Sequence, residues 1–346
     1  TAANITERAL EQLEVDPRVA GIFYDVVLYN QLSQAVPLIR GDWAHNHSVS
    51  GQGQTVCIVD TGIDGSLNIF ENRVLPGYNF IANNNNTMDD NGHGTKVASI
   101  VAGRSGVAPN STILPLKVCN FAGACQLSTL LGGIDFCLNK TTVYNISALS
   151  ASVGDGGQYT QTNCPTYMDS TLFALTTANI TPVVASGNNG FIGGISYPSC
   201  SPYAIAVGAT DKSDNIASFT NRGTALDVLA PGVGIQATTI GGGTQSFSGT
   251  SAAAPFVSGT VALLQELAAR NNSKLAFSKT LSLISGEGPL VSSWHRIDVE
   301  ENINNISNVS SSGFTIQVVP IAALVNITTF TPNSTTSVAG VWNYSM

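Results

Sequence analysis

The sequence predicts a doubly wound α/β fold, in which a mostly parallel sheet carries helices on both faces. The prediction rests on two observations. Short runs of apolar and β-branched residues alternate along the chain with longer segments of helical periodicity, a pattern typical of βαβ units. The first run, TVCIVD at 55–60, is almost wholly apolar and ends at an acidic residue and a Gly turn, as expected for a strand buried on both faces of a parallel sheet.

The same patterns give the order of the elements. Strands are expected at 55–60, 112–118, 182–186 and 204–209, and helices at about 94–103, 126–139, 168–180 and 251–270. In open sheets of this class, ligands bind beyond the carboxyl ends of the strands. Asp60 and the Gly187-Asn188 pair lie at such ends, so we expect the functional site there.

Composition bounds the class of protein. Of the 346 residues, 43% are hydrophobic, which is enough for one large domain with a substantial core. Charged residues make up only 10% and the net charge is −8, which argues against a nucleic-acid partner. The sequence contains no run of roughly 18 apolar residues, so we expect no segment that spans a membrane. Because the chain starts at Thr1 without a signal peptide, we expect a processed or trimmed product.

Two features indicate an extracellular, glycosylated protein. Asn-x-Ser/Thr sequons number thirteen, and chance alone would give about half as many. Examples are Asn4, Asn85, Asn110, Asn179, Asn271 and Asn333. The six cysteines are even in number, which is typical of disulfide-bonded secreted proteins. The alternative is buried free thiols, above all for Cys57 inside an apolar strand.

Three short segments carry the residue types of a hydrolytic triad. They are Asp60-Thr61-Gly62, His93-Gly94-Thr95 and Gly249-Thr250-Ser251-Ala252. Each segment alone is equally well explained by a turn or by the start of a helix. Together they supply a nucleophile, a base that takes its proton and an acid that orients the base, which acyl transfer requires. The sequence therefore predicts a catalytic triad of Asp60, His93 and Ser251.

The segments VDTGID, NGHGTKVASIVAG, GVAP, ASGNNG and FSGTSAAAP resemble those of subtilisin-like serine proteases, the subtilase family, within residues 33–305. The resemblance implies the subtilisin-like form of this fold, endopeptidase action on polypeptide substrates, and no cofactor in the chemistry. It also implies that Asn188 donates to the oxyanion, together with the backbone N–H of Ser251. The alternative for Asn188 is a loop residue that favours positive φ beside Gly187 and Gly190.

The resemblance further implies a groove for extended peptides. Substrate would pair as a β-strand with Gly123-Ala124-Cys125 on one side and Ser152-Val153-Gly154 on the other. Cys125 replaces a Gly usual in the family and is expected to narrow the groove. The first specificity pocket, which takes the residue before the cleaved bond (P1), would be lined by Ser152–Gly154, Ala185–Gly187 and Ser196. Asn189 stands where some relatives carry Glu, so we expect broad specificity with a preference for large apolar P1 side chains over Lys or Arg.

Metal sites are expected to be few. No His/Cys cluster has zinc spacing and no EF-hand loop occurs in the sequence. The loop that holds a tight calcium ion in many family members is missing between KVASIVAG and RSGVAP. The resemblance implies one weak structural calcium site, formed by Asp227 with the backbone carbonyls of Ser199, Ser201 and Ala204. The alternative for Asp227 is a solvated turn residue.

The cysteines allow many pairings, and the sequence alone does not choose among them. Our hypothesis has three parts. Cys119 and Cys125 close a short loop at the groove edge, and Cys164 pairs with Cys200. Cys57 and Cys137 face each other between a strand and a helix, either bonded or as free thiols.

Three segments make up the expected domain organisation. Residues 33–305 form the catalytic domain, and 306–346 form a strand-rich or linker-like extension to which the sequence assigns no role. Residues 1–32 include DPRVAGIFYDVVLYNQL, which resembles the end of the family's inhibitory propeptide. The chain's own propeptide would then act as an intramolecular inhibitor.

The same alignment places the processing bond between Leu32 and Ser33. Leu32 would fill the first pocket as a product does, and Tyr29 would fill an apolar pocket three residues upstream. The alternative is that residues 1–32 are an ordinary N-terminal element of the mature enzyme.

Two rival classes explain less of the sequence. Asp-Thr-Gly is also the signature of aspartic proteases, but that mechanism needs a second Asp in a similar turn, and the sequence has no second Asp-Thr-Gly or Asp-Ser-Gly. A binding protein on an inactive protease fold is the other rival. The complete set of catalytic residue types disfavours it.

Overall fold

A seven-stranded parallel sheet forms the centre of the molecule, in the order β2-β3-β1-β4-β5-β6-β7. The structure is a computed structural model and describes residues 32–311. The strands of this sheet are β1 (Thr55–Asp60), β2 (Tyr78–Asn79), β3 (Thr112–Lys117), β4 (Ile146–Ala151), β5 (Thr181–Ala185), β6 (Ile205–Thr210) and β7 (Val228–Pro231). The chain adds β3 on one side of β1 and β4 on the other. The carboxyl ends of β1 and β4 therefore flank the point at which the strand order reverses, where open sheets bind ligands.

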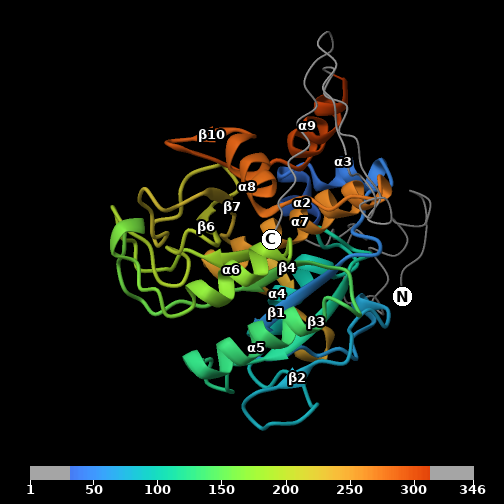
Figure 1. The fold of residues 1–346 in the computed structure, drawn as a ribbon, viewed down its shortest axis with the longest axis vertical. Coiled ribbons are helices and arrows are strands. Elements are labelled where there is room, and N and C mark those ends of the chain that lie inside the picture. The colour runs from blue at the N-terminus through green and yellow to red at the C-terminus, as the bar shows by residue number, and fades with distance from the viewer. Residues whose placement is uncertain (1–31, 312–346) are drawn as a thin grey trace, which may run out of the picture. The chain divides into compact units, whose positions relative to one another are not determined.

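Helices cover both faces of this sheet (Figure 1). The helices α4 (His93–Ala102) and α7 (Thr250–Arg270) pack on one face, and α5 (Leu127–Asn139) and α6 (Asp169–Thr177) pack on the other. Strand β1 shows why both faces must be covered, because Val56 and Ile58 enter the first core while Cys57 and Val59 enter the second. The predicted doubly wound α/β fold is confirmed.

Shorter elements surround the two layers. The remaining helices are α2 (Leu32–Leu38), α3 (Gly41–Asn46), α8 (Phe277–Gly286) and α9 (Val299–Ser311), with short 3-10 helices at Asn68–Phe70, Gln161–Asn163 and Ile240–Gly242. Two antiparallel ribbons pair β8 (Ile235–Thr238) with β9 (Thr244–Phe247), and β10 (Leu290–Val291) with β11 (Trp294–His295).

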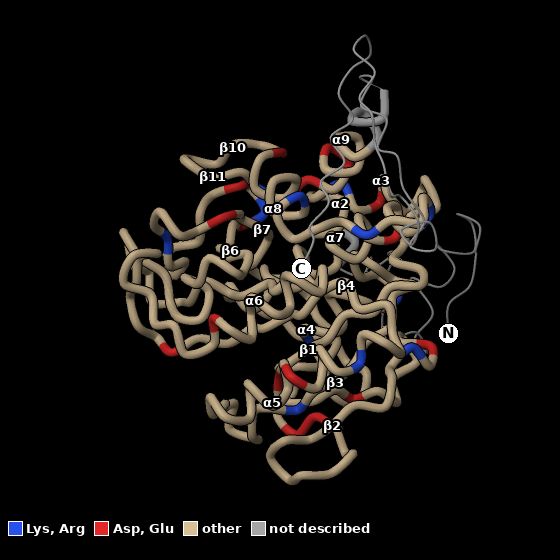
Figure 2. The backbone as a smooth tube through the Cα atoms, in the orientation of Figure 1, with Lys and Arg blue, Asp and Glu red and all other residues tan. Residues whose placement is uncertain are grey.

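Charged residues are dispersed among a majority of uncharged ones (Figure 2). One ionic cluster joins the two ends of the described chain. The guanidinium of Arg40 lies 2.6 Å from Asp298, 2.8 Å from Glu300 and 3.0 Å from Glu301. Opposite charges at these distances fasten the turn between α2 and α3 to the start of α9.

Helix α7 is the centre of the first core. Within residues 32–311 it is the one helix long and apolar enough to cross a membrane, but 89% of its apolar window is buried inside the protein. It packs against α4 and against the strands from β4 to β7. A side chain at Gly259 would come within 2.6 Å of Val107, so the absence of one allows close approach. Its burial identifies α7 as the core helix of the α/β layers.

The predicted strands and helices occur at their expected places, with ends that differ by a few residues. Strand β4 was not among the predicted strands because its sequence, ISALSA, lacks the large branched residues typical of strands. All six residues are nevertheless buried. Their small size suits the close packing of α7 on this part of the sheet.

Several sequence-based expectations fall at the ends of the chain. Residues 1–31, with Tyr29, and residues 312–346 lie outside the described residues. Leu32 and Ser33 form the beginning of α2. Helix α9 continues to Ser311, so the first residues of the extension expected at 306–346 are helical.

Candidate active site

The four predicted catalytic residues line one groove at the carboxyl edge of the sheet. The groove has a volume of about 740 Å³, and Asp60, His93, Asn188 and Ser251 all contribute to its wall. Each comes from a different element. They are the last residue of β1, the first residue of α4, the loop after β5 and the second residue of α7, respectively.

Asp60 and His93 form an acid–base pair in which Asp60 is buried and His93 is partly exposed. The imidazole Nδ1 lies 2.8 Å from Oδ1 and 3.0 Å from Oδ2 of the carboxylate. Oδ1 also accepts the N–H of Thr61 at 2.7 Å. Burial lowers the pKa of His93, but the charge and hydrogen bond of Asp60 more than offset this effect, so the net pKa is raised. The contact fixes Nδ1 as the protonated nitrogen and leaves Nε2 to accept a proton.

Three glycines allow the acid and the base to meet. A side chain at Gly94 would clash with the carbonyl oxygen of Gly62 and come within 3.1 Å of Cβ of Asp60. Gly62 has φ +108°, a conformation that favours glycine. Gly92, directly before α4, has φ 97°. The glycines of the two sequence motifs are therefore needed for the distance between Asp60 and His93.

Ser251 lies in the first turn of α7, directly after Gly249 and Thr250. Its Oγ donates to the carbonyl oxygen of Ser152 at 3.3 Å, so the hydroxyl is held at the end of β4. The N-terminus of a helix favours negative charge, because its first N–H groups have no partner within the helix. Ser251 is thus placed where a negative charge that develops at an attacked carbonyl is stabilised.

The amide of Asn188 has a fixed orientation. Its Oδ1 accepts the N–H of Thr250 at 2.8 Å and the Oγ1–H of Thr250 at 3.0 Å. Thr250 is fully buried, and its Oγ1 also accepts the N–H of Gly187 at 3.1 Å. Because Oδ1 faces two donors, Nδ2 is the end of the amide that remains to donate elsewhere.

Asp89 supports the pair, although the sequence analysis did not single it out. Its Oδ1 accepts the Oγ1–H of Thr61 and the N–H groups of Asn91 and Gly92, and its Oδ2 accepts both the N–H and the Oγ1–H of Thr95, all within 3.0 Å. Burial raises the pKa of Asp89, but these hydrogen bonds outweigh burial, and the net pKa is lowered. This carboxylate thereby ties the turn after β1 to the start of α4.

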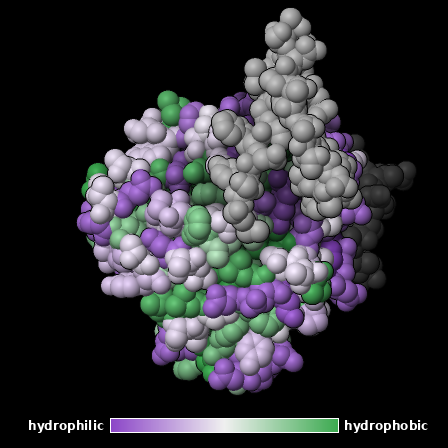
Figure 3. Space-filling model, in the orientation of Figure 1, coloured by the Kyte–Doolittle hydropathy of each residue, from purple (hydrophilic) through white to green (hydrophobic). Residues whose placement is uncertain are grey.

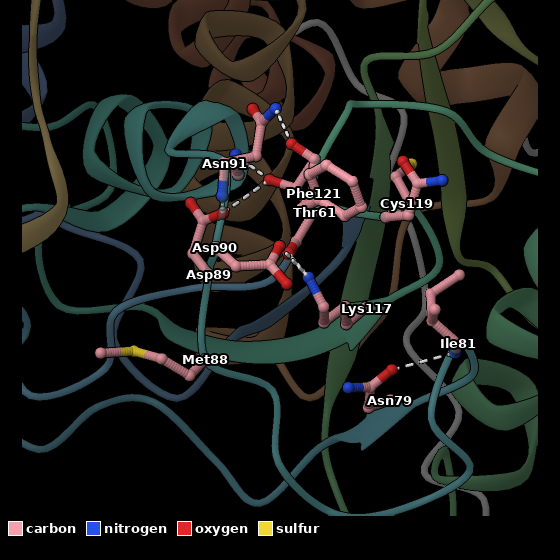
Figure 4. A network of polar contacts seen from close by, with 12 residues as sticks. Thr61, Asn79, Ile81, Met88, Asp89, Asp90, Asn91, Lys117, Cys119 and Phe121 are labelled. Carbon is pink, nitrogen blue, oxygen red and sulfur yellow. Dashed lines mark hydrogen bonds and ion pairs between the residues drawn. The ribbon is translucent and has the colours of Figure 1, made fainter.

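Lys117 also links the turn after β1 to the loop before α4 (Figure 4). Only 4% of its side chain is exposed, and its Nζ lies 2.6 Å from Oδ1 of Asp90 and donates to the carbonyl oxygen of Thr61. On the opposite side, Nδ2 of Asn91 donates to the carbonyl oxygen of Phe121 at 2.9 Å. The loop before His93 is therefore joined to β1, to β3 and to the hairpin that follows β3.

That hairpin is the predicted edge of the groove. Gly123, Ala124 and Cys125 all line the cavity, as does Cys119. Cys119 and Cys125 are disulfide-bonded and also pair as an antiparallel bridge. Phe121 at the tip is 72% exposed, on a protein whose surface mixes apolar and polar residues (Figure 3).

The other two disulfides also join the pairs named in the hypothesis. Cys57 of β1 is bonded to Cys137 of α5, and Cys164 to Cys200. The described residues contain no free cysteine. The alternative of free thiols at Cys57 and Cys137 is not what the structure shows.

The remaining predicted pocket residues also meet in the groove, except Ser186, which is fully buried and does not line it. The others are Ser152, Val153, Gly154, Ala185, Gly187, Asn189 and Ser196. Behind them lies Asn221, which is fully buried, accepts the N–H groups of Asn189 and Phe191, and donates to Ser196 Oγ at 3.0 Å. Asp155, which no sequence motif indicates, is a further carboxylate that lines the groove.

The predicted cation-site residues come from two segments, with Ser199, Ser201 and Ala204 before β6 and Asp227 before β7. Asp227 precedes β7, is half-buried, and its Oδ2 accepts the N–H of Ala206 at 2.8 Å. Burial raises the pKa of Asp227 to about 6, with this hydrogen bond acting in the opposite direction. The hydroxyl of Ser201 donates to Asp169, not to Asp227. Within residues 32–311 no group of three or more His, Cys, Asp or Glu residues is arranged to hold a metal ion.

Comparisons with known proteins identify the family of this chain. Residues 51–282 match the family model described as the subtilase family, Peptidase_S8. Alkaline elastase YaB of Bacillus sp. (strain YaB) is 33% identical over 265 residues, which cover 74% of this chain and 66% of the relative. Subtilisin E of Bacillus subtilis (strain 168) is 34% identical over 280 residues, which cover 76% and 69%. The chain thus spans about two thirds of the length of these relatives.

A solved structure gives the same result for the fold. A cold adapted subtilisin-like serine proteinase superposes with a TM-score of 0.63 at 29% sequence identity. The alignment covers 70% of this chain and 86% of that protein.

Proposed function

The chain belongs to the subtilase family of serine endopeptidases, and on that basis we propose that it is a secreted enzyme whose triad is Asp60, His93 and Ser251. The observation that carries the proposal is the meeting of these three side chains and Asn188 in one groove, with Nδ1 of His93 held against Asp60. Sequence motifs separated by long stretches of chain come together there with complementary chemical roles.

The proposed reaction begins with attack by Ser251 Oγ on the carbonyl carbon of the substrate. Nε2 of His93 takes the hydroxyl proton and later gives it to the leaving amine, and water then releases the acyl group by the same route. The hydroxyl first leaves the carbonyl oxygen of Ser152, which is a rotation about one side-chain bond. Asp60 stabilises the imidazolium that forms, because its carboxylate stays hydrogen-bonded to Nδ1.

Asn188 and the N-terminus of α7 are the proposed oxyanion hole. Nδ2 of Asn188 and the backbone N–H of Ser251 would donate to the oxygen of the attacked carbonyl. Both donors are set before substrate binds, because Thr250 holds the amide and the helix fixes the backbone. Such preorganised donors stabilise the transition state without further rearrangement.

Polypeptide substrates would bind as an extended strand between Gly123–Cys125 and Ser152–Gly154. The first pocket has backbone walls at Gly154 and Gly187, and a side chain at either glycine would meet Ser196. A pocket kept open in this way suits large P1 side chains. We propose broad specificity with a preference for large apolar residues at P1.

Maturation and export form a second part of the proposal. Residues 1–32 would be the end of an inhibitory propeptide, released by cleavage between Leu32 and Ser33. In the structure these two residues share the first turn of α2, so cleavage requires that turn to unwind into an extended strand. Three disulfides support an oxidising, extracellular location. Asn85, Asn110 and Asn271 are exposed, as glycosylation requires.

No cofactor is needed for this chemistry, and we propose one weak structural calcium site. Asp227 with the carbonyls of Ser199, Ser201 and Ala204 would hold the ion. Oxygen atoms of these kinds suit a calcium ion, and the partly buried carboxylate of Asp227, which accepts one hydrogen bond from the N–H of Ala206 and has a raised pKa, supports the proposal. A bound cation would supply the missing partner for that charge.

The direct test is covalent labelling with a fluorophosphonate, together with turnover of a peptide substrate. Wild-type protein should be labelled at Ser251 and should cleave the peptide, and Ser251→Ala should do neither while it keeps its melting temperature. N-terminal sequencing of the active protein should give Ser33. A correctly folded wild-type protein that is neither labelled nor active would identify an inactive protease fold instead.

A further inference from the structure

The first pocket contains a carboxylate that the triad does not use. Asp155 follows Gly154 on the wall of the pocket and is exposed to the groove. Asp60 also lines the cavity, but its carboxylate is engaged by His93. Asp155 is therefore the acidic group that a bound substrate meets.

The segment Ser196–Tyr197, which we call the floor of the first pocket, sets the position of Asp155 through backbone hydrogen bonds. The N–H of Asp155 donates to the carbonyl oxygen of Tyr197 at 3.0 Å, and its Oδ1 accepts the N–H of Tyr197 at 3.1 Å and that of Gly157 at 2.9 Å. Tyr197 directly follows Ser196. The carboxylate is thus anchored next to Ser196 and does not depend on a flexible surface turn.

The second oxygen of Asp155 has a neutral partner. Oδ2 accepts the phenol of Tyr159 at 3.0 Å, and this hydrogen bond raises the pKa of Tyr159. The three donors around Asp155 are uncharged, so its charge is hydrogen-bonded but not neutralised. Oδ2 also keeps a free acceptor position.

The other polar groups of the floor are already paired. Ser196 Oγ donates to the carbonyl oxygen of Gly157 at 3.1 Å and accepts from Asn221 at 3.0 Å. The oxygen of Asn221 accepts two backbone N–H groups, those of Asn189 and Phe191. A polar P1 side chain that reaches the floor therefore finds Asp155 as its available partner.

We propose that Asp155 is a specificity-determining residue that makes the first pocket accept Lys at P1 beside large apolar side chains. The inference rests on the proposed peptidase function of the groove. The four methylene groups of Lys can pack along the same walls as an apolar side chain, while its ammonium donates to Oδ2 of Asp155. This revises the expectation drawn from Asn189, because the charge comes from a different residue that lines the groove.

The experiment compares peptides that differ only in having Lys or Met at P1, two side chains of similar length. The measured quantity is the Lys:Met ratio of kcat/KM for the wild type, for Asp155→Asn and for the control Asp211→Asn. Asp211 is an exposed turn residue that accepts backbone N–H groups from Ser213 and Asn215, outside the groove. The control removes the same charge from the protein at a similar kind of turn.

We expect the ratio to fall by about fivefold in Asp155→Asn, the effect of roughly 1 kcal/mol for a partly solvated ion pair, and to stay at the wild-type value in Asp211→Asn. For the wild type alone, the ratio should also fall as salt is raised from about 0.05 to about 0.5 M, because salt screens the pair. If Asp155→Asn does not fold, a wild-type ratio that does not change with salt overturns the inference.

An unchanged ratio in a folded Asp155→Asn variant would overturn the inference and leave the peptidase intact, since both peptides would still be cleaved. An equal fall in Asp211→Asn would also overturn it, because the effect would then come from net charge. A wild-type protein that cleaves neither peptide and is not labelled at Ser251 would overturn the proposed function and this inference together.

Discussion

The role of Asn188 can be tested by separating the two ends of its amide. In the structure Oδ1 accepts two hydrogen bonds from Thr250, and Nδ2 is the end that remains for the oxyanion. Asn188→Ala removes both ends. Asn188→Asp keeps acceptor oxygens that can face Thr250 but removes the donor.

The expected losses differ between stability and turnover. Removal of one oxyanion-hole donor costs about 10²–10³ in kcat, or about 2.7–4 kcal/mol, a figure measured on subtilisin, a relative of this chain. Asn188→Ala also leaves the N–H of the buried Thr250 without its acceptor, which costs about 1–3 kcal/mol of unfolding free energy. Asn188→Asp should lose at least as much kcat as the alanine variant, with a smaller loss of stability.

Steady-state kinetics and thermal unfolding of the two variants provide the measurements. The donor acts on the transition state, so kcat should fall while KM changes little. A kcat within tenfold of the wild type in both variants would refute the reasoning. So would a rise in KM at constant kcat, because Asn188 would then contribute to ground-state binding alone.

Three further predictions follow from the site. Ser251→Ala and His93→Ala should each abolish most activity, and the double variant should lose little more than either single one, because the two residues act as a unit; additive losses in kcat would contradict this. The acid limb of the kcat/KM profile should report the raised pKa of His93, since the base is inactive when protonated. Asp60→Asn removes the charge that raises this pKa, so the acid limb should move to lower pH at a much lower kcat; an acid limb that stays in place would show that Asp60 does not set the pKa. A calcium chelator should lower the melting temperature by only a few degrees, through loss of a weak site at Asp227, whereas complete unfolding in chelator would reveal a strong site elsewhere.

The sequence predicted those parts of the site that depend on local motifs. Asp60, His93 and Ser251 each lie within two residues of a motif glycine. The same glycines that allow the geometry of the site therefore also make the motifs recognisable in the sequence. Asn188 followed from the resemblance alone. The pairing of the cysteines was a hypothesis because distance along the chain does not show which strand faces which helix.

The supporting residues depend on tertiary contacts that no short motif contains. Lys117 meets Thr61 because β3 lies beside β1 in a register that places Asp60 opposite Lys117. Asp155 belongs to the pocket because its neighbour is Tyr197, far along the chain. Strand β4 was missed for the same kind of reason, since burial between two layers, and not its own residue types, makes it a strand.

The close packing of α7 has a consequence for how the protein loses activity. His93 is the first residue of α4 and Ser251 is the second residue of α7, and the two helices lie against each other. Gly259 of α7 is in close contact with Val107, in the segment that follows α4. The packing of α4 against α7 therefore sets the distance between His93 and Ser251. A core that loosens slightly, with every helix still formed, would already separate the two groups, so in a denaturant titration inactivation should precede the loss of helical circular dichroism.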